Sequence, residues 1–369
     1  MSFLEKLLDG AVVEWLALDS IAKIKHGRDW KGLAEGNVPV YGSGGIMGYV
    51  DTYSYNKPTV LIPRKGSITN VFYVDTPFWN VDTIYYTEIN TQIIIPKYFY
   101  YFIKTIDLLS LDTGSGRPSL TQAILNRIQV PIPCPENPEK SLKIQSQIVR
   151  ILDNFSTLTA ELTTELSMRK QQYNYYRDQL LTFKNDKIEW KKLGEVAEIG
   201  TGSHDTQDAI DDGNYIFYAR GREALRLNVF DFDETAIITA GDGAGVGKVF
   251  HYAQGKYALH QRAYRIAPKE IMDPRFVYHC IASYFCMYIQ KASVSSSVTS
   301  LRKPMFLNFP IPFPPLNEQK RIANLLDKFD ALTSSVNEGL PREIELRQQQ
   351  YEYYRNLLFS FPKSETVAV

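Results

Sequence analysis

Residues 147–183 read QIVRILDNFSTLTAELTTELSMRKQQYNYYRDQLLTF, and residues 319–361 read QKRIANLLDKFDALTSSVNEGLPREIELRQQQYEYYRNLLFSF. The second segment repeats the first in two blocks. The first block shares Ile148, Leu152, Asp153, Phe155, Leu158 and Thr159, which recur as Ile322, Leu326, Asp327, Phe329, Leu332 and Thr333. The second block shares Arg169, Gln172, Tyr173, Tyr175, Tyr176, Arg177 and Leu180, which recur as Arg347, Gln350, Tyr351, Tyr353, Tyr354, Arg355 and Leu358. This repeat is far longer than the roughly 20–50 residues of a solenoid unit, so it indicates duplication of a whole domain plus a helix.

The duplication extends upstream of these segments. Trp15, Leu18, Ala22, Ile24 and Gly27 recur at constant spacing as Trp190, Leu193, Ala197, Ile199 and Gly202. A proline-rich stretch, VPIPCPENPEK or FPIPFPPLNEQ, closes each globular region, and proline cannot continue a preceding strand. We therefore predict five parts: globular regions at 1–145 and 187–318, helices at 146–186 and 319–363, and a tail at 364–369.

The globular regions alternate short β-branched runs with Gly, Pro and Asn turns, as in VPVYG, TVLIP and TNVFYV. Each also carries one amphipathic stretch that begins with proline, at Pro96–Leu109 and Pro274–Gln290. The pattern predicts an α/β (mixed α+β) fold with twisted, largely antiparallel sheets. Because the region is duplicated, we expect pseudo-two-fold symmetry.

The helical segments carry apolar residues at alternating steps of four and three, which is typical of a coiled-coil seam. We expect the two seams to pack on each other, as a rod of roughly 55 Å at 1.5 Å per residue. Pro341 should kink the second helix or restart it after Gly339. The predicted seam residues are Ile148, Leu152, Phe155, Leu162, Leu166, Tyr173, Tyr176, Leu180, Ile322, Leu326, Phe329, Tyr351, Tyr354 and Leu358.

Composition narrows the class of protein. Lys+Arg and Asp+Glu both number 41, and zero net charge argues against a freestanding non-specific DNA binder. The three cysteines, Cys134, Cys280 and Cys286, have neither disulfide-framework nor metal-ligand spacing, which fits a reducing compartment. Charged residues interrupt the N-terminal stretch MSFLEKLLDGAVVEW, and no run is long and apolar enough to span a bilayer. We therefore expect a cytoplasmic protein without a membrane anchor.

Motifs for catalysis are absent. The glycine run at 241–248 fails both the P-loop and the G-x-G-x-x-G patterns, which leaves a tight loop between strands or a loop whose backbone approaches a ligand or phosphate. Glu189-Trp190-Lys191 matches only the E-x-K fragment of nucleases, and the five histidines lack metal-site spacing. The sequence predicts no catalytic residue, no metal site and no cofactor bound by this chain.

The repeated motifs resemble the specificity (S) subunit of type I restriction-modification enzymes. The resemblance rests on the openings at Trp15–Ile24 and Trp190–Ile199, on PIPFPPLNEQKRIANLLDKFDALT, and on the QQYNYYRDQLL and QQYEYYRNLL pair. It implies two target recognition domains, each reading one half of a bipartite double-stranded DNA site. It also implies antiparallel spacer helices that dock methyltransferase subunits, two in number, and restriction subunits. In that family the S subunit is not catalytic, and S-adenosylmethionine, ATP and Mg²⁺ are used by other subunits. Members work in the cytoplasm of bacteria or archaea.

Two basic strips are the candidate DNA contacts. Residues 52–74 and 243–267 lack acids and follow equivalent strands, and the YARGRE stretch adds a weaker candidate. Lysines suit phosphate contact, whereas Arg, Asn and Gln carry the edges that read guanine or adenine. The candidates are Lys57, Arg64, Lys65, Ser67, Asn70, Arg220, Arg222, Lys248, His260, Gln261 and Arg262. The strips differ between repeats, so the two half-sites should differ in sequence.

Other interpretations remain open at this level. A symmetric scaffold that spaces two protein partners, or a two-headed transcriptional regulator, would share the duplicated layout. Tyr175, Tyr353, Arg177 and Arg355 point off the seam and are candidates for partner binding. The first proline-rich boundary is longer than the second and lacks its compact PPLNEQ, so the link between globular region and helix should differ between the halves.

Overall fold

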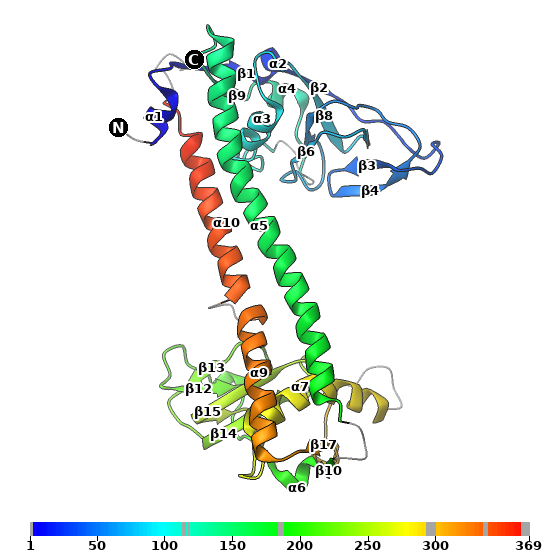
Figure 1. Ribbon diagram of the computed structural model, residues 1–369, viewed down its shortest axis with the longest axis vertical. Helices are drawn as coiled ribbons and strands as arrows, with labels where there is room; N and C mark the ends of the chain where they lie inside the picture. Colours follow the sequence, from blue (N-terminus) through cyan, green and yellow to red (C-terminus); the bar gives the residue numbers. More distant parts are fainter. Residues whose placement is uncertain are drawn as a thin grey trace. The chain divides into compact units, whose positions relative to one another are not determined.

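The computed structural model describes residues 3–112, 116, 118–183, 188–292, 300–334 and 339–362. The chain divides into two compact units (Figure 1). Unit 1 comprises Met1–Thr163 with Glu343–Val369, and unit 2 comprises Thr164–Arg342. Helix α5 (Pro138–Leu181) runs unbroken from one unit into the other. The tail predicted at 364–369 lies outside the described residues.

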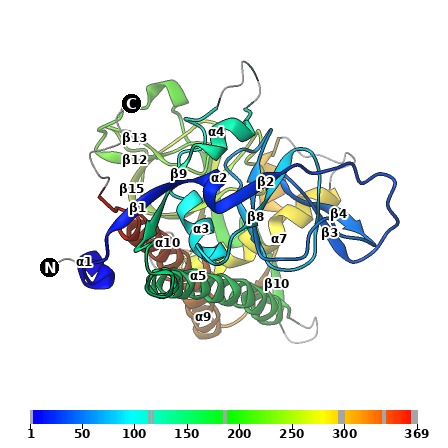
Figure 2. The same ribbon diagram turned by 90° about the horizontal axis from the view of Figure 1, so that it is seen from above.

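Unit 1 is built on a four-stranded sheet of order β2-β8-β5-β6, with a separate three-stranded sheet β4-β3-β7 and a two-stranded pair β1-β9. Figure 2 shows it from above. Its elements before α5 are α1 (Phe3–Leu8), β1 (Val13–Ala17), α2 (Leu18–Ile21), β2 (Ala22–Lys25), β3 (Val38–Gly42), β4 (Gly45–Val50), β5 (Thr59–Pro63), β6 (Phe72–Val74), β7 (Trp79–Asn80), β8 (Ile84–Ile89), α3 (Pro96–Ile103), α4 (Gln122–Asn126) and β9 (Gln129–Pro133).

Unit 2 is built on a six-stranded sheet of order β11-β16-β14-β15-β12-β13, with a two-stranded pair β10-β17. Its elements after α5 are β10 (Glu189–Lys192), α6 (Leu193–Val196), β11 (Ala197–Thr201), the 3₁₀ turn η1 (Thr206–Asp208), β12 (Tyr215–Tyr218), β13 (Leu225–Leu227), β14 (Phe232–Ala240), β15 (Phe250–Leu259), β16 (Ala263–Pro268), α7 (Pro274–Ala292), α8 (Lys303–Leu307), β17 (Pro310–Phe313) and α9 (Leu316–Ser334).

The two units share one topology, which confirms the duplicated α/β fold. The order β2-β8-β5-β6 in unit 1 corresponds to β11-β16-β14-β15 in unit 2. Most pairs are antiparallel, and each unit adds one parallel pairing, β3 with β7 and β12 with β15. The outer strands differ: in unit 1 they form a separate sheet, whereas in unit 2 they extend the main one.

The repeated opening motif has a packing reason. Its tryptophan lies on the first strand of each unit, and its leucine begins the short helix that follows. Leu18 and Leu193 are fully buried, and the Ala and Ile of the next strand are also buried. Side chains at every second position of a strand face the same side, so the Ala and Ile of the motif point together into the core. The motif therefore corresponds to one turn of helix and one strand that pack on the core of each unit.

Several predicted helix boundaries were wrong, including the start of the second spacer helix, which lies at Leu316 rather than at 319. Helix α5 begins at Pro138, not at 146, because Asn137 accepts a hydrogen bond from the Lys140 amide (3.1 Å) and proline suits the first helical position. It ends at Leu181. The first amphipathic helix ends at Ile103 rather than at Leu109, since the Asp107 carboxylate accepts the Leu109 amide (3.0 Å) in a turn.

The second spacer segment is two helices, as Pro341 suggested. Helix α9 ends at Ser334, and α10 (Gly339–Leu358) starts at a glycine with φ of +74° and carries Pro341 in its first turn. Residues 335–338 between them lie outside the described ranges.

The seam residues pack in two ways. Near the ends of the helices they join the cores: Ile148, Leu152 and Leu358 are buried in the core of unit 1, and Ile322 and Leu326 in that of unit 2. The expectation that the seams bury mainly each other was therefore incomplete.

Farther along the helices, aromatic rings pair across them. Phe155 stacks on Tyr354 within unit 1, with ring centroids 5.3 Å apart. Tyr173 and Tyr176 both contact Phe329 within unit 2, at 6.2 and 5.8 Å. In each unit the paired helices run antiparallel, α5 with α10 in unit 1 and α5 with α9 in unit 2 (Figure 1).

Other seam residues are less enclosed. Leu162, Leu166 and Tyr351 are half-buried. Tyr176 remains 40% exposed although it stacks on Phe329. At the end of α5 the buried residue is Leu181, while Leu180 only packs against the core. The heptad spacing predicted Leu180 as the buried residue at this end of α5, so it missed the buried position by one residue.

Candidate nucleic-acid interface

Three loops meet at the same place in each unit. In unit 1 they are the β3–β4 turn, the β5–β6 connection and the residues just before β8. In unit 2 the corresponding loops are the β12–β13 turn, the β14–β15 connection and the residues just before β16. Most of the predicted DNA-binding residues lie on these loops, although they are dispersed in the sequence.

In unit 1 the three loops are joined through Thr83. Its carbonyl accepts the amides of Arg64 (2.9 Å) and Lys65 (3.3 Å), and its hydroxyl accepts the amide of Ser43 (3.2 Å). The Asn70 side-chain amide donates to the Ser43 carbonyl at 3.1 Å. Lys65 and the nearby Ser67 are exposed. The structure thus brings Arg64, Lys65, Ser67 and Asn70 onto one surface.

Lys57 does not share that surface with Arg64. The Arg64 guanidinium is held by Asp82, donating to its carbonyl at 3.3 Å with a carboxylate oxygen at 3.9 Å. Lys57 lies before β5 and Arg64 after it, so they are at opposite ends of this five-residue strand. Lys57 lines a pocket of about 770 Å³ with Asp19 and Glu88. The strip at 52–74 is therefore split in space.

In unit 2 an acidic residue gathers the arginines. The Arg220 guanidinium donates to one Asp242 carboxylate oxygen at 2.9 Å, and Arg262 donates to the other at 3.1 Å. Burial alone would raise the pKa of Asp242, but these two hydrogen bonds outweigh it and lower the pKa. Arg222 is exposed and lines a pocket of about 400 Å³ with Arg220 and Asp242. The two stretches predicted separately thus form one cluster.

The glycine run forms the connection between β14 and β15, as the loop interpretation expected. A Cβ at Gly245 would lie 2.6 Å from the carbonyl oxygen of Arg220, so only glycine fits where this loop approaches the β12–β13 turn. Gly243 has φ of +80°. Lys248 is exposed on the same loop. The glycines of this run therefore allow the β14–β15 loop to pack closely against the β12–β13 turn.

His260 and Gln261 lie on the loop just before β16, His260 buried and Gln261 exposed. The Gln261 amide donates to the Asp205 carboxylate at 2.8 Å, and this bond lowers the pKa of Asp205. The Nδ1 of His260 accepts the Arg262 amide at 2.9 Å, and the ring is 1% exposed. Burial, followed by the nearby Arg220 charge, lowers the pKa of His260, so its ring is neutral at pH 7. We assign His260 to supporting the loop rather than to contacting a ligand.

Sequence reasoning missed the acidic partners. The strip at 243–267 contains no acid, yet two of its polar residues are held from outside it, Arg262 by Asp242 and Gln261 by Asp205. No linear pattern signals such pairing. Arginines held by a carboxylate lose less side-chain freedom when they bind, so the ion pairs pre-order the cluster.

A second set of missed residues joins each unit to its helix. Gln145 accepts the Ile95 amide at 2.8 Å, and Gln319 accepts the Asp273 amide at 2.8 Å; both are fully buried. Each glutamine thereby connects the spacer helix to the start of the amphipathic helix α3 or α7. Gln319 is the first residue of the second repeated segment, whereas Gln145 precedes the first segment, and the role of this pair was not predicted.

The repeated aspartates make a matching connection. Asp153 accepts Lys97 at 2.8 Å and the Tyr101 hydroxyl at 2.6 Å. Asp327 accepts Arg275 Nε at 2.9 Å and His279 at 2.7 Å. These partners lie on α3 and α7, so each globular region is fixed to its helix at an equivalent place, although by different side chains.

The described residues offer no metal or membrane chemistry. No group of three or more His, Cys, Asp or Glu side chains within them could hold a metal ion. None of the helices in the described ranges has the length and apolar character needed to cross a membrane. Cys280 is buried and its thiol pKa is raised by burial, as a small core residue requires.

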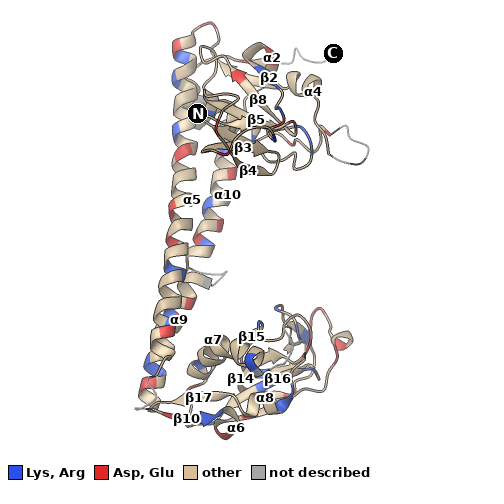
Figure 3. Ribbon diagram, turned by 90° about the vertical axis from the view of Figure 1, so that its right-hand side faces the viewer, with Lys and Arg blue, Asp and Glu red and all other residues tan. Residues whose placement is uncertain are grey.

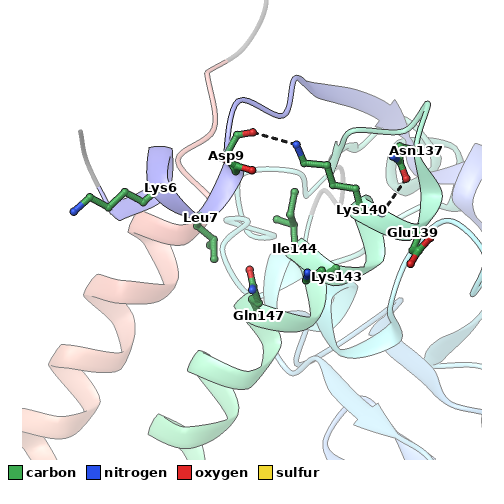
Figure 4. Close-up of a pocket in the computed structure, with 9 residues that line it drawn as sticks. All are labelled: Lys6, Leu7, Asp9, Asn137, Glu139, Lys140, Lys143, Ile144 and Gln147. Carbon is green, nitrogen blue, oxygen red and sulfur yellow. Dashed lines mark hydrogen bonds between the residues drawn. The ribbon is translucent and has the colours of Figure 1, made fainter.

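Unit 1 also has a pocket of about 600 Å³ between α1 and the start of α5 (Figure 4). Lys140 donates there to the Asp9 carbonyl at 3.1 Å. Lys6, Lys143, Glu139 and Asp9 give it mixed charge. It contains none of the predicted DNA-binding residues.

Both charges are interspersed along α5 (Figure 3). An exposed tyrosine lies at the equivalent position of each repeated helix, Tyr175 on α5 and Tyr353 on α10. Tyr175 is 62% exposed and Tyr353 64%, and each lies beside a second tyrosine at 5.4 and 5.3 Å. Arg177 and Arg355 lie over neighbouring rings at 5.8 and 5.6 Å. Each unit therefore presents the same aromatic and basic surface.

The chain is a duplicated mixed α/β protein whose two units present polar loops at equivalent places. Comparison with known proteins shows which family has this architecture. The sequence matches the family described as type I restriction modification DNA specificity domain over residues 13–168 and again over 185–346. The two matches correspond to the two halves of the internal repeat. The chain belongs to this family.

Relatives and solved structures agree with that membership. The chain is 39% identical over 403 aligned residues to the EcoR124I/EcoR124II specificity subunit of Escherichia coli, covering 100% of this chain and 99% of the relative. It is 30% identical to the EcoprrI specificity subunit of the same species, with 92% of each covered. A crystal structure of the S subunit from M. genitalium has the same fold, with a TM-score of 0.67, 16% identity and coverage of 96% and 98%. The chain is a type I restriction-modification specificity subunit.

Proposed function

We propose that this chain reads a bipartite DNA site, one half with each unit, on behalf of a restriction-modification complex. The observation that carries the proposal is the duplicated set of three loops. In each unit they bring basic and amide side chains onto one surface, including Arg64 and Asn70 in unit 1 and Arg220, Arg262 and Gln261 in unit 2. Such side chains suit phosphate contact and base-edge reading.

The framework residues are repeated, whereas the loop residues differ. Gln145 and Gln319 make equivalent bonds, yet Ser43 and Thr83 organise the loops of unit 1 and Asp242 those of unit 2. The two half-sites should therefore differ in sequence while the units bind DNA in the same manner. The continuous helix α5 would set the gap between them.

The partners follow from the duplication as well. The repeated surfaces around Tyr175 and Tyr353 are suited to two copies of one partner, which we propose to be methyltransferase subunits. Restriction subunits would join the same assembly, which we place in the cytoplasm. One structural neighbour, with a TM-score of 0.55 and 13% identity, comes from work on complex assembly of a type I restriction-modification system.

The chain itself should have no catalytic activity. S-adenosylmethionine, ATP and Mg²⁺ would be bound by the other subunits. Pure chain incubated with all three and plasmid DNA should leave the DNA unmethylated and uncut. Turnover that co-elutes with the purified chain would refute this assignment.

Methylome sequencing tests the recognition function. The chain is expressed in a host without restriction-modification systems, together with the methyltransferase subunit encoded beside it. The methylated motif should have two halves separated by a fixed gap. Arg220→Ala with Arg262→Ala should change or abolish recognition of one half only, whereas Arg342→Ala, outside the loops, should leave the motif intact. A continuous motif, or one independent of the chain, would contradict the proposal.

A further inference from the structure

The first hairpin of each unit occupies the same position but carries different chemistry. Both hairpins follow the strand after the short helix, and one strand of each pairs in parallel with a later strand. In unit 2 the turn between β12 and β13 carries Arg220 and Arg222. In unit 1 the turn between β3 and β4 is followed by Ile46 and Met47.

Ile46 and Met47 are exposed by a β-bulge. The register pairs Val40 with Gly48 and then Tyr41 with Ile46, which leaves Met47 as the extra residue. A bulge bends a strand and redirects its side chains, and bulges are common beside binding sites. Ile46 is 51% exposed and Met47 57%.

Core packing does not account for these two side chains. The buried residues of this sheet are Val40 and Val50, with Trp30 packed against them. Trp30 also covers Gly48, where a Cβ would lie 2.8 Å from its ring. Ile46 and Met47 are not part of this cluster, although the Met47 side chain covers Gly42, where a Cβ would lie 2.4 Å from its Sδ. Strands β3 and β4 lie on the side of unit 1 away from α5 (Figures 1 and 2).

The hairpin is part of the candidate DNA surface. Ser43 in its turn is bonded to Thr83 and Asn70, and a Cβ at Gly66 would lie 3.2 Å from the Ser43 hydroxyl. The two apolar side chains therefore stand on the same hairpin that contacts the loop of Arg64 and Lys65. Apolar groups beside basic and amide groups match a major groove, where a two-stranded ribbon fits and thymine presents its C5-methyl group.

We propose that Ile46 and Met47 are specificity-determining residues that contact thymine C5-methyl groups in the half-site read by unit 1. The proposal rests on the DNA-reading function above. The corresponding hairpin of unit 2 has arginines in its turn, so that half-site is read there by hydrogen bonds to guanine. The two units thus use one hairpin position for two kinds of base recognition.

Deoxyuridine, which lacks only the C5-methyl group, is the direct probe. The complex of the full chain with its methyltransferase subunit is bound to a duplex that carries the methylated motif. Each thymine of both half-sites is replaced in turn. Loss of a methyl contact should weaken binding about fourfold at one or two positions. These positions should fall in the half-site that Arg220→Ala with Arg222→Ala does not affect.

Variants complete the test. Ile46→Ser with Met47→Ser should bind the thymine duplex about tenfold more weakly and should no longer distinguish thymine from deoxyuridine. Ile46→Val with Met47→Leu keeps apolar contacts and should retain the discrimination. Unchanged thermal unfolding of both variants shows that the fold is preserved.

The outcomes separate this inference from the general function. Equal binding of thymine and deoxyuridine duplexes by the wild-type complex would overturn the inference, as would discrimination that survives in the serine variant. If the serine variant binds more weakly while the wild-type complex itself shows no sensitivity to deoxyuridine, the two side chains would act as a wedge between base steps, and this would also overturn the inference. Failure of the wild-type complex to prefer its motif over unrelated duplex would refute the recognition function itself.

Discussion

At the scale of single residues, the repeated glycines show why the duplication is preserved in detail. A Cβ at Gly27 would lie 2.0 Å from the carbonyl oxygen of Val81, and at Gly202 it would lie 1.8 Å from that of Leu259. Neither distance is possible for a side chain. The two glycines follow equivalent strands, β2 and β11, and each lets the backbone approach closely beside a loop of the candidate interface.

Gly27→Ala should therefore destabilise unit 1. The backbone around Val81 must shift, which we expect to lower the free energy of unfolding by about 3 kcal/mol. Gly32→Ala is the matched control, because no atom lies within 4 Å of its Cβ position. Thermal unfolding of the two variants measures the difference, and equal melting temperatures would contradict the packing described for Gly27.

The ion pair between α7 and α9 also acts at this scale. Burial alone would raise the pKa of Asp327, but hydrogen bonds from His279 and Arg275 outweigh it and lower the pKa from 3.8 to about 2. Because the folded-state pKa is lower, the stabilisation is complete above about pH 5 and is lost as pH falls from 4 through 2.

Asp327→Asn should remove this pH dependence. The carboxylate is partly exposed to solvent, so we expect a contribution of about 1–2 kcal/mol rather than the full value of the shift. Urea unfolding at pH 6 and at pH 2.5 measures it in the wild type, the variant and the exposed control Asp212→Asn. A stability difference between Asp327→Asn and wild type that is equally large at both pH values would show that the charge is not responsible.

At the scale of elements, the spacer helices hold together through aromatic pairs as well as through the cores. Phe155 on α5 and Tyr354 on α10 stack with an interplanar angle of 18°. Offset stacked rings contribute roughly 0.5–1.5 kcal/mol beyond the area they bury. This pair is the clearest contact between the two helices within unit 1.

A double-mutant cycle of Phe155→Ala and Tyr354→Ala should give a coupling free energy of about 1 kcal/mol. The control cycle pairs Phe155→Ala with Tyr353→Ala. Tyr353 is 64% exposed, so its coupling to Phe155 should be near zero. Chemical unfolding of the four proteins in each cycle supplies the values. Strong coupling of Tyr353 and none of Tyr354 would mean that the helix face has been assigned wrongly.

Element boundaries show where sequence reasoning succeeds and where it stops. The heptad spacing located the seam through Ile148, Leu152 and Leu326 because periodicity is a local property of a helix. It could not show that these residues also enter the cores, which depends on distant strands. The start of α5 was missed because the Asn137-Pro138 cap was interpreted as part of a connector.

At the scale of the whole molecule, the duplication was readable and the candidate site only partly so. Paired motifs predicted two equivalent folds, since framework residues recur at constant spacing. The cluster of Arg220, Arg262 and Asp242 depends on three loops that meet only after the sheet has formed, and Lys57 was separated from Arg64 by a strand between them. Ile46 and Met47 carry no sequence signal, because exposure of apolar residues is decided by the fold.

We propose that α5 acts as the ruler that sets the gap between the two half-sites. The helix is continuous over Pro138–Leu181, and four added residues would lengthen it by about 6 Å while roughly preserving the direction of its faces. B-DNA rises about 3.4 Å per base pair, so the length change corresponds to one or two base pairs.

The most direct measurement is methylome sequencing of cells that carry the chain with Leu-Thr-Thr-Glu inserted after Glu165. The gap between the half-sites should grow by one or two base pairs, and both half-site sequences should stay unchanged. Replacing residues 162–165 in place by four alanines controls for the altered sequence and should keep the original gap. An active insertion variant with an unaltered gap, or with altered half-site bases, would contradict the account.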